Sequence, residues 1–149
     1  MSQQDAIQNT YATNRQTATQ IWLRMIRVAQ KISQAAEAPL DAMDLTAPQF
    51  DLLAQLVQTE GIMQQELAEK MHVTKGNISQ LLTKLEEKQL ILRQKEGRTV
   101  YAYLTPAGRK LIEAELVNYD HFVASRFTAL SSEEQRDLLK LLHKLDRSL

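Results

Sequence analysis

The stretch that most constrains the fold runs from Gln64 to Leu90, QQELAEKMHVTKGNISQLLTKLEEKQL, and it predicts two short helices joined by a tight turn. In the first helix, Leu67 and the small Ala68 are expected to face inward, so that the second helix can cross closely above them. Thr74 is a good N-cap for the second helix, because its hydroxyl can accept a hydrogen bond from an N–H that lacks a partner within the helix.

The second of these helices has two faces of different character. Apolar residues recur at i, i+3, i+4 and i+7, which places them on one stripe; they are Ile78, Leu81, Leu82 and Leu85. At about 100° per residue the other side is small, polar and cationic, and such groups can bond to base edges and phosphates in a DNA groove. The candidate DNA-binding residues here are Thr74, Lys75, Gly76, Asn77, Ser79, Gln80, Thr83 and Lys84. Two amphipathic helices alone, however, fit a helical hairpin with a solvated outer face better.

The residues that follow predict a β-hairpin. Two strand-like runs, 90–94 and 99–104, flank a turn at 95–98, and the second run alternates apolar and polar residues with a period of two. A hairpin directly after a helix pair of this kind is the wing of a winged helix-turn-helix. Its tip residues Lys95 and Arg98 are expected to reach the flanking minor groove or its phosphates.

The charge of the chain supports this interpretation. The 149 residues hold 18 Lys and Arg and 18 Asp and Glu, so the formal net charge is zero. Between Lys70 and Lys110, however, nine basic residues stand against three acidic ones, an excess of +6 that the remainder of the chain balances. For nucleic-acid binding the distribution of charge matters more than its sum. The basic segment coincides with the helix pair and the hairpin.

Helices are predicted on both sides of this segment. Apolar residues at helical spacing predict one long helix from about Thr13 to Ala36, which Pro39 ends, and a connecting loop follows as far as Leu45. The sequence TAPQ predicts the next helix, with Thr46 as N-cap and Gln49 completing a capping box. Ile62 is expected to form a very short strand, and Met63 is a poor N-cap for the helix after it.

The C-terminal third predicts two more helices. Thr105 and Pro106 are a cap followed by proline at the first helical position, and this helix runs to about Phe127. A break at 129–130 leads to a second capping box, Ser131 with Glu134, and to a leucine-rich last helix.

The fold expected is therefore mainly α (α+β), a winged helix-turn-helix with long N- and C-terminal dimerisation helices. The winged DNA-binding domain spans 45–104, and the dimerisation helices span 10–38 and 105–149. These helices are more apolar than one small winged domain requires, so we expect them to interlock across a two-fold axis. Such a dimer presents two recognition helices to half-sites about 34–36 Å apart.

Three phrases in the chain resemble the multiple antibiotic resistance regulator (MarR) family of winged-helix bacterial repressors. They are LTAPQFDLLAQL (45–56), QQELAEKMHVTKGNISQLLTKLEEKQLI (64–91) and LTPAG (104–108). The family's wing usually has acidic residues that fix its arginine, whereas this wing, RQKEGRTVYAY, has no aspartate, and Arg98 is its match to the wing arginine. The family also favours glycine where this chain has Gln89, so the turn after the recognition helix is expected to be built differently.

The resemblance implies a transcriptional regulator, in most members a repressor, that binds a palindromic operator as an obligate homodimer and releases it when a small-molecule effector binds. The rival function is a winged-helix module that binds another protein and has no sequence-specific DNA binding. That module would have no need to keep Gln80, Lys84 and Arg98 outward together.

An effector is expected to be a small aromatic or phenolic compound. In relatives that bind aromatic acids, the ligand lies in a cleft between the helical dimer region and the winged domain. The candidate lining residues in this chain are Tyr11, Trp22, Arg24, Met25, Phe50 and Tyr119. Packing in a core or an interface explains each of them equally well.

Other functions find little support in the sequence. None of the three histidines has a nucleophile or carboxylate close in sequence and arranged for acid–base work, so an enzyme is not expected. The chain has no cysteine and no His-x₃₋₅-His pair, so neither a metal site nor a cofactor is expected. A zinc site built from His121 with Asp120 or Glu115 is the weaker alternative. No apolar run approaches the roughly 20 residues of a membrane span, and the N-terminus lacks a signal peptide, so a cytoplasmic protein is expected.

Overall fold

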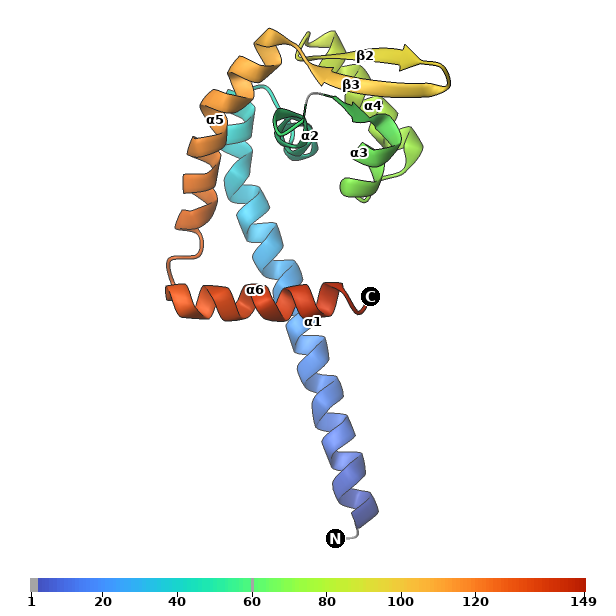
Figure 1. Ribbon diagram of the computed structural model, residues 1–149. Coiled ribbons are helices and arrows are strands. Elements are labelled where there is room, and N and C mark those ends of the chain that lie inside the picture. Colours follow the sequence, from blue (N-terminus) through green and yellow to red (C-terminus); the bar gives the residue numbers. More distant parts are fainter. Residues whose placement is uncertain (1–2, 60) are drawn as a thin grey trace. The chain divides into compact units, whose positions relative to one another are not determined.

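The computed structural model describes residues 3–59 and 61–149, and these ranges form helices and one small sheet (Figure 1). In chain order the elements are α1 (Gln3–Ala42), α2 (Ala47–Val57), β1 (Ile62–Met63), α3 (Gln64–Lys70), α4 (Lys75–Glu87), β2 (Ile91–Glu96), β3 (Thr99–Leu104), α5 (Pro106–Ser125) and α6 (Ser132–Asp146). The chain divides into two compact units, 1–37 and 38–149, and the boundary falls within α1. The predicted order of helices and hairpin, and with it the winged helix-turn-helix, is confirmed.

Both expected bounds of the first helix were wrong. α1 begins at Gln3, well before the predicted start near Thr13, because this exposed part is helical without an apolar stripe that periodicity could reveal. Pro39 lies inside α1, which continues to Ala42. A proline inside a helix removes its own N–H bond and crowds the carbonyl four residues before it, and the burial of Leu40 just beyond it offsets this cost. The turn that follows the helix end at Ala42 is made by Asp44, which has a left-handed φ of 53°. The Asp44 N–H donates to the Asp41 carbonyl and the Leu45 N–H to the Leu40 carbonyl, both at 3.0 Å, which is the Schellman arrangement.

The predicted caps are present. Thr46 and Gln49 exchange bonds as a capping box, with the Thr46 N–H donating to Gln49 Oε1 at 3.1 Å. Thr74 caps α4, and Thr105 caps α5 by accepting from the Gly108 N–H at 3.0 Å. Ser131 and Glu134 form the second box, at the start of α6. Met63 precedes α3 without a side-chain cap, as expected.

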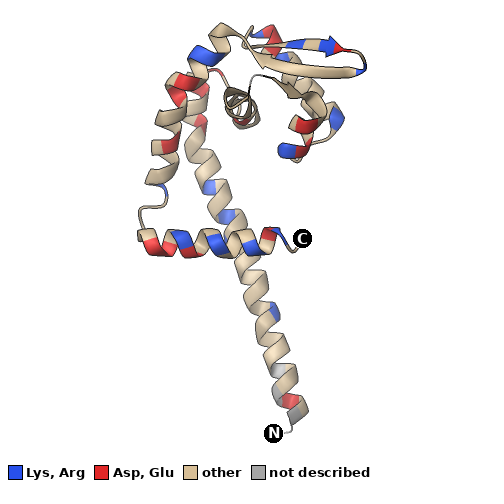
Figure 2. Ribbon diagram, in the orientation of Figure 1, with Lys and Arg blue, Asp and Glu red and all other residues tan. Residues whose placement is uncertain are grey.

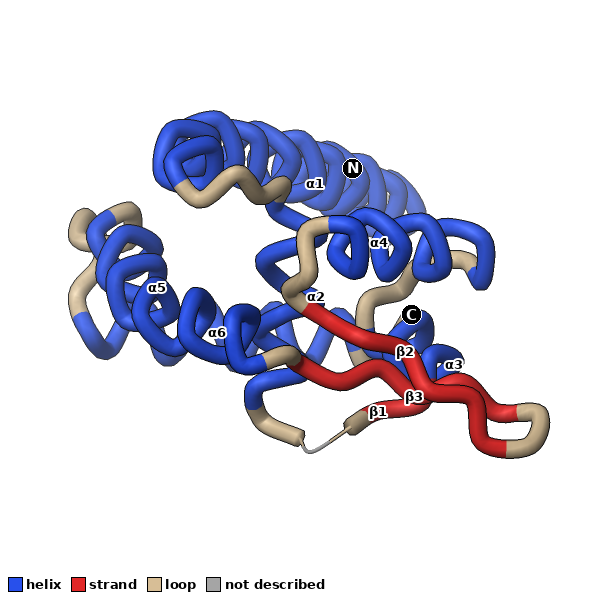
Figure 3. Tube along the Cα trace, turned by 90° about the horizontal axis from the view of Figure 1, so that it is seen from above, coloured by secondary structure: helices blue, strands red, loops and turns tan. Residues whose placement is uncertain are grey.

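The three strands form an antiparallel sheet in the order β1-β3-β2, and β2 and β3 make the wing (Figure 3). Their register runs from Ile91 opposite Leu104 to Glu96 opposite Thr99. The turn was predicted too long, because Lys95 and Glu96 pair with β3 and only Gly97 and Arg98 connect the strands. Gly97 has a φ of 62°, which glycine adopts at little cost and which suits a two-residue hairpin turn.

The core of unit 38–149 lies where α2, α3, α4 and α5 meet the inner face of the sheet. Its fully buried large side chains are Leu52, Leu53, Leu56, Leu67, Ile78, Leu82, Leu85, Ile91 and Ile112. Ile78, Leu82 and Leu85 are the predicted apolar stripe of α4, and Leu81 beside them is half-buried. Because this stripe is buried, the opposite side of α4 must face outward.

Candidate nucleic-acid interface

The first three turns of α4 present the polar face that the sequence predicts. Of the eight candidate residues on this helix, seven are exposed and Ser79 is half-buried. Thr74 is committed to the helix start, since its hydroxyl accepts from the Asn77 N–H at 3.2 Å. Gly76, Gln80 and Lys84 are outward residues that follow at four-residue spacing along one side of the helix. We call α4 the recognition helix.

The wing carries the second cationic group. Lys95 lies near the end of β2 and Arg98 in the hairpin turn, and both are exposed. Lys and Arg mark β2 and the tip of the hairpin in Figure 2, and the hairpin projects beyond the helices of its unit in Figure 1. The structure therefore brings an outward polar helix face and a basic hairpin tip together in one unit.

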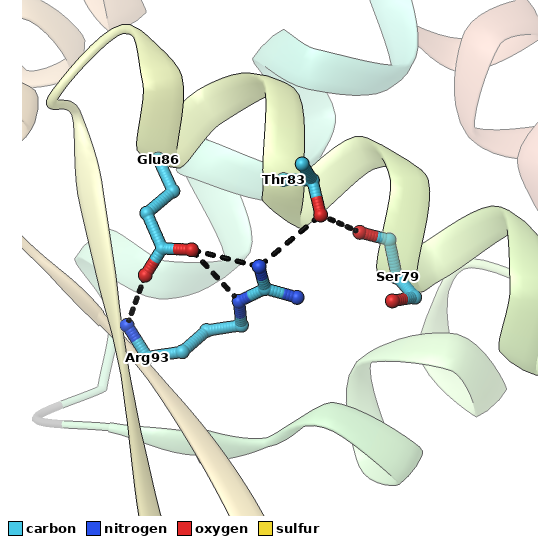
Figure 4. A network of polar contacts seen from close by, with 4 residues as sticks. All are labelled: Ser79, Thr83, Glu86 and Arg93. Carbon is cyan, nitrogen blue, oxygen red and sulfur yellow. Dashed lines mark hydrogen bonds and ion pairs between the residues drawn. The ribbon is translucent and has the colours of Figure 1, made fainter.

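An ion pair that the sequence reasoning missed joins the wing to the recognition helix (Figure 4). Arg93 of β2 donates from Nε to Glu86 Oε2 at 3.1 Å and from Nη2 to the same oxygen at 2.7 Å. The Arg93 backbone N–H donates to Glu86 Oε1 at 3.1 Å. These bonds to the Arg93 side chain, followed by that to its backbone N–H, hold the pKa of Glu86 below its usual value against an opposing effect of burial. We call this pair the Glu86–Arg93 clamp.

The clamp extends along the recognition helix to a candidate DNA contact. Arg93 Nη2 also donates to Thr83 Oγ1 at 3.1 Å, and the Thr83 hydroxyl in turn donates to the Ser79 carbonyl at 2.9 Å (Figure 4). Thr83 is exposed, but its hydroxyl already has two hydrogen-bond partners within the protein. A signal for Arg93 was present in the sequence, because the period-two alternation puts it on the same strand face as the buried Ile91.

A second contact holds the end of the recognition helix. Lys88 Nζ lies 3.1 Å from Asp44 Oδ2 and also donates to the Asp44 carbonyl. The last turn of α1 has no basic residue of its own, and a cation is favourable at a helix C-terminus. Lys88 supplies that cation. Lys84, by contrast, lines a hollow of about 620 Å³ together with three carboxylates, those of Asp41, Asp44 and Glu87.

The family comparison agrees with this geometry. Residues 45–98 match the model of the MarR family. The chain is 38% identical to an uncharacterized HTH-type transcriptional regulator of Bacillus cereus over 128 residues, 85% of this chain and 87% of the relative. It is 33% identical to an HTH-type transcriptional repressor of Mycobacterium bovis over 127 residues, 81% of this chain and 89% of that one. The chain belongs to the MarR family.

Solved structures agree as well. The DNA complex of Staphylococcus aureus MepR matches with a TM-score of 0.77 and 31% identity, over 87% of this chain and 97% of MepR. Bordetella bronchiseptica BpsR shares the fold with a TM-score of 0.79 at 22% identity, over 85% of this chain and 98% of BpsR. This MarR-family chain is a DNA-binding transcriptional regulator.

The turn after the recognition helix shows how the chain manages without the glycine that MarR regulators favour there. Gln89 itself adopts the left-handed conformation, with a φ of 59°. Its N–H donates to the Glu86 carbonyl at 2.9 Å, and the Leu90 N–H donates to the Leu85 carbonyl at 3.0 Å. This is the ordinary Schellman ending, so the expectation of a differently built turn was wrong. Gln89, which has a Cβ, occupies the left-handed position that glycine would occupy without strain.

Replacing Gln89 with glycine should therefore stabilise the protein. An L-residue pays about 1 kcal/mol or more for the left-handed conformation, which glycine adopts freely, so Gln89→Gly should gain about 1 kcal/mol. The measurement is the urea midpoint at constant m-value. Gln55→Gly, inside α2, is the matched control and should lose about 1 kcal/mol. A Gln89→Gly protein no more stable than wild type would show that this turn is unstrained.

The effector candidates are divided between the two units. Phe50 and Tyr119 lie together in unit 38–149, with ring centroids 4.3 Å apart, and Phe50 is buried. Packing between α2 and α5 already accounts for these two side chains. Tyr11, Trp22, Arg24 and Met25 all belong to α1 in unit 1–37, where Met25 is half-buried and the other three are exposed.

Two other observations concern the described residues. Among them no group of three or more His, Asp or Glu side chains is placed to hold a metal ion. Within residues 3–59 and 61–149, no helix combines the length and apolar character that crossing a membrane requires.

Proposed function

We propose that this regulator is a repressor that binds a palindromic operator as a homodimer. The observation that carries the proposal is the pairing of an outward polar face on α4 with an exposed basic hairpin tip in one unit. A helix of this kind fits the major groove, while a wing beside it reaches the flanking minor groove. Because the relatives named above are bacterial regulators and this chain would act on chromosomal DNA as they do, the place of action proposed is the cytoplasm.

The proposed DNA contacts fall into two groups. Asn77 and Gln80 carry side-chain amides, which can bond to an adenine edge with two bonds and so read sequence. The remaining contacts position the protein on the backbone; they are Thr74, Lys75, Gly76, Ser79, Thr83, Lys84, Lys95 and Arg98. Within this group we place Thr83 last, because Arg93 and the Ser79 carbonyl already engage its hydroxyl.

The proposed dimer rests on the last helix. No residue of α6 is buried, although five of its fifteen residues are leucines. Four of them, Leu138, Leu141, Leu142 and Leu145, follow at helical spacing and form one stripe. An apolar stripe left open to water is a typical site for another protein surface. We propose that 105–149 and 10–38 are the dimerisation segments and that 45–104 is the winged domain.

The salt dependence of binding tests the wing contact. Arg98→Ala should weaken binding to all DNA sequences and make the slope of log K against log salt shallower by about 0.9, the value for one lost phosphate contact. Lys84→Ala should also weaken binding and make the slope shallower, by less than about 0.9 if the carboxylates of Asp41, Asp44 and Glu87 hold part of its charge. The measurement is a fluorescence titration between about 50 and 200 mM salt. A slope unchanged by Arg98→Ala would remove the wing tip from the interface.

We also propose that a small aromatic or phenolic compound releases the protein from its operator. Two proteins that share the fold support this: DNA binding by BpsR is regulated by 6-hydroxynicotinic acid, and NadR forms a complex with 4-hydroxyphenylacetate. The candidate contacts stay Tyr11, Trp22, Arg24, Met25, Phe50 and Tyr119. The aromatic pair Phe50–Tyr119 would have to open to admit a ligand, since its rings are already in contact.

A further inference from the structure

The wing of this protein has one strong polar contact with the recognition helix. Within the described residues, the Glu86–Arg93 clamp accounts for every ion pair between β2 and α4. Its geometry is that of a charge-assisted bond from a guanidinium to a carboxylate, further fixed by the Arg93 backbone N–H and by Thr83. Hydrogen bonds between β2 and β3 hold the hairpin together, and the buried Ile91 and Ala102 pack its base against the core. The clamp adds a directional contact from β2 to α4 above this packed base.

Arg93 is poorly placed to be a DNA contact itself. Its Nε and Nη2 are used within the protein, and only 24% of its side chain is exposed. It lies on the strand face that turns toward α4, whereas Arg98 is exposed in the hairpin turn. The guanidinium of Arg93 is therefore directed toward Glu86 and Thr83 of the recognition helix.

We propose that Glu86 and Arg93 are positioning residues that fix the angle between the wing and the recognition helix. This proposal rests on the proposed DNA-binding function. A strand rises about 3.3 Å per residue, so the tip at Gly97 lies roughly 13 Å along the chain from Arg93. A swing of about 10° at the clamp would move the tip by roughly 2 Å, enough to break a hydrogen bond of ordinary length. The clamp thus sets whether the wing and the recognition helix can contact one DNA site together.

The wing has no aspartate to fix its arginine, and the clamp supplies another support for the wing. The acidic partner comes from the recognition helix instead of from the wing itself. The support therefore acts on the base of the hairpin and leaves Arg98 at the tip to contact DNA.

The substitution Glu86→Gln distinguishes this role from simple electrostatics. It removes a negative charge beside the DNA-binding surface, which by charge alone should tighten binding. Loss of the clamp should instead weaken binding about tenfold, or 1.4 kcal/mol, with the salt slope unchanged because no phosphate contact is lost. Arg93→Lys keeps the charge but cannot reproduce the contact from two nitrogens, so it should lose a similar factor.

The matched control is Arg109→Gln, which breaks an exposed arginine–glutamate pair with Glu113 within α5 and leaves the contact between β2 and α4 intact. It should bind like wild type. Since the chain has no cysteine, Glu96→Cys accepts a single dye near the wing tip, and its anisotropy decay reports the angular motion of the hairpin. In the Glu86→Gln and Arg93→Lys backgrounds the dye should sweep a wider cone, while the control should match wild type.

Three results separate the possibilities. Weaker binding of both clamp variants, an unchanged slope and a wider cone support the proposal. Binding of Glu86→Gln equal to or tighter than wild type contradicts it, as does weaker binding of the clamp variants with an unchanged cone, because the hairpin would then keep its angle without the clamp. If the wild-type protein itself binds no DNA, the proposed function fails, and that outcome is distinct from failure of the clamp.

Discussion

Replacing Gly108 with alanine should destabilise the protein by about 3 kcal/mol, the upper end of what an added methyl group costs in a closed space. Gly108 is buried in the first turn of α5, directly after the wing. A Cβ at this position would lie 1.9 Å from the Leu90 carbonyl oxygen and 2.8 Å from the carbonyl carbon. Because these atoms are backbone, they cannot rotate away. They also belong to the segment that joins the recognition helix to β2.

The Leu90 carbonyl is fixed from another side as well. It accepts a hydrogen bond from the Thr105 N–H at 3.1 Å, and the Thr105 hydroxyl donates to the Gln89 carbonyl at 2.7 Å. Relief of the clash would break this junction, so α5 and the wing should separate when alanine is present. Urea unfolding measures the loss, and DNA binding should fall with it.

Gly76→Ala is the matched control. Gly76 also lies in the first turn of a helix, but the atom nearest to a Cβ added there would be Thr74 Oγ1 at 4.0 Å. Stability should therefore stay level or rise by up to about 1 kcal/mol, the helix propensity difference. Equal stability of the Gly108→Ala and Gly76→Ala proteins would show that the junction at Leu90 is not tightly packed.

Replacing Leu141 with lysine should abolish dimerisation and weaken operator binding by at least about a hundredfold, the gain expected from two linked half-site contacts. Leu141 is 64% exposed within the chain, so the substitution removes nothing from the chain's own core. It does place a charge in the middle of the leucine stripe of α6. The new positive charge alone would favour DNA binding, so weaker binding has a sign that simple electrostatics cannot explain.

Lys140→Ala provides the comparison on the same helix, because Lys140 faces away from the stripe. Sedimentation at micromolar concentration should show twice the chain mass for this variant and for wild type, and the chain mass for Leu141→Lys. A Leu141→Lys protein that remains dimeric would move the interface away from α6.

The elements of the fold were predictable because local signals agreed with one another. Thr46, Thr105 and Ser131 each precede a helix by one residue, and all three caps form. The errors at the end of α1 and at the wing turn have physical causes. A proline often marks a helix end, because it removes a hydrogen bond and crowds the preceding turn, but the burial of Leu40 offsets that cost at Pro39. The predicted wing turn is too long because polar residues are typical of turns, although strand pairing retains the two polar residues 95 and 96 in β2.

The candidate site was predictable only in part. Outward residues of α4 follow from helical periodicity, since the apolar stripe fixes the opposite face. The Glu86–Arg93 clamp and the Lys88–Asp44 pair depend on how separate elements meet. Strand alternation could place Arg93 on the inner face of β2, but no spacing within the sequence identifies Glu86 as its partner. A differently built turn was expected because the family favours glycine where this chain has Gln89, yet Gln89 adopts the same left-handed geometry at a cost in strain.

Binding-site selection from random duplex DNA, with the purified protein, tests the central claim most directly. We predict an enriched inverted repeat whose half-site centres lie about 10–10.5 base pairs apart. Gln80→Ala or Asn77→Ala should relax preference at one or more positions in each half-site, at about 1–3 kcal/mol for a base read by two bonds. Absence of any enriched sequence, with DNA binding no stronger than nonspecific charge contacts provide, would contradict sequence-specific operator recognition by this protein.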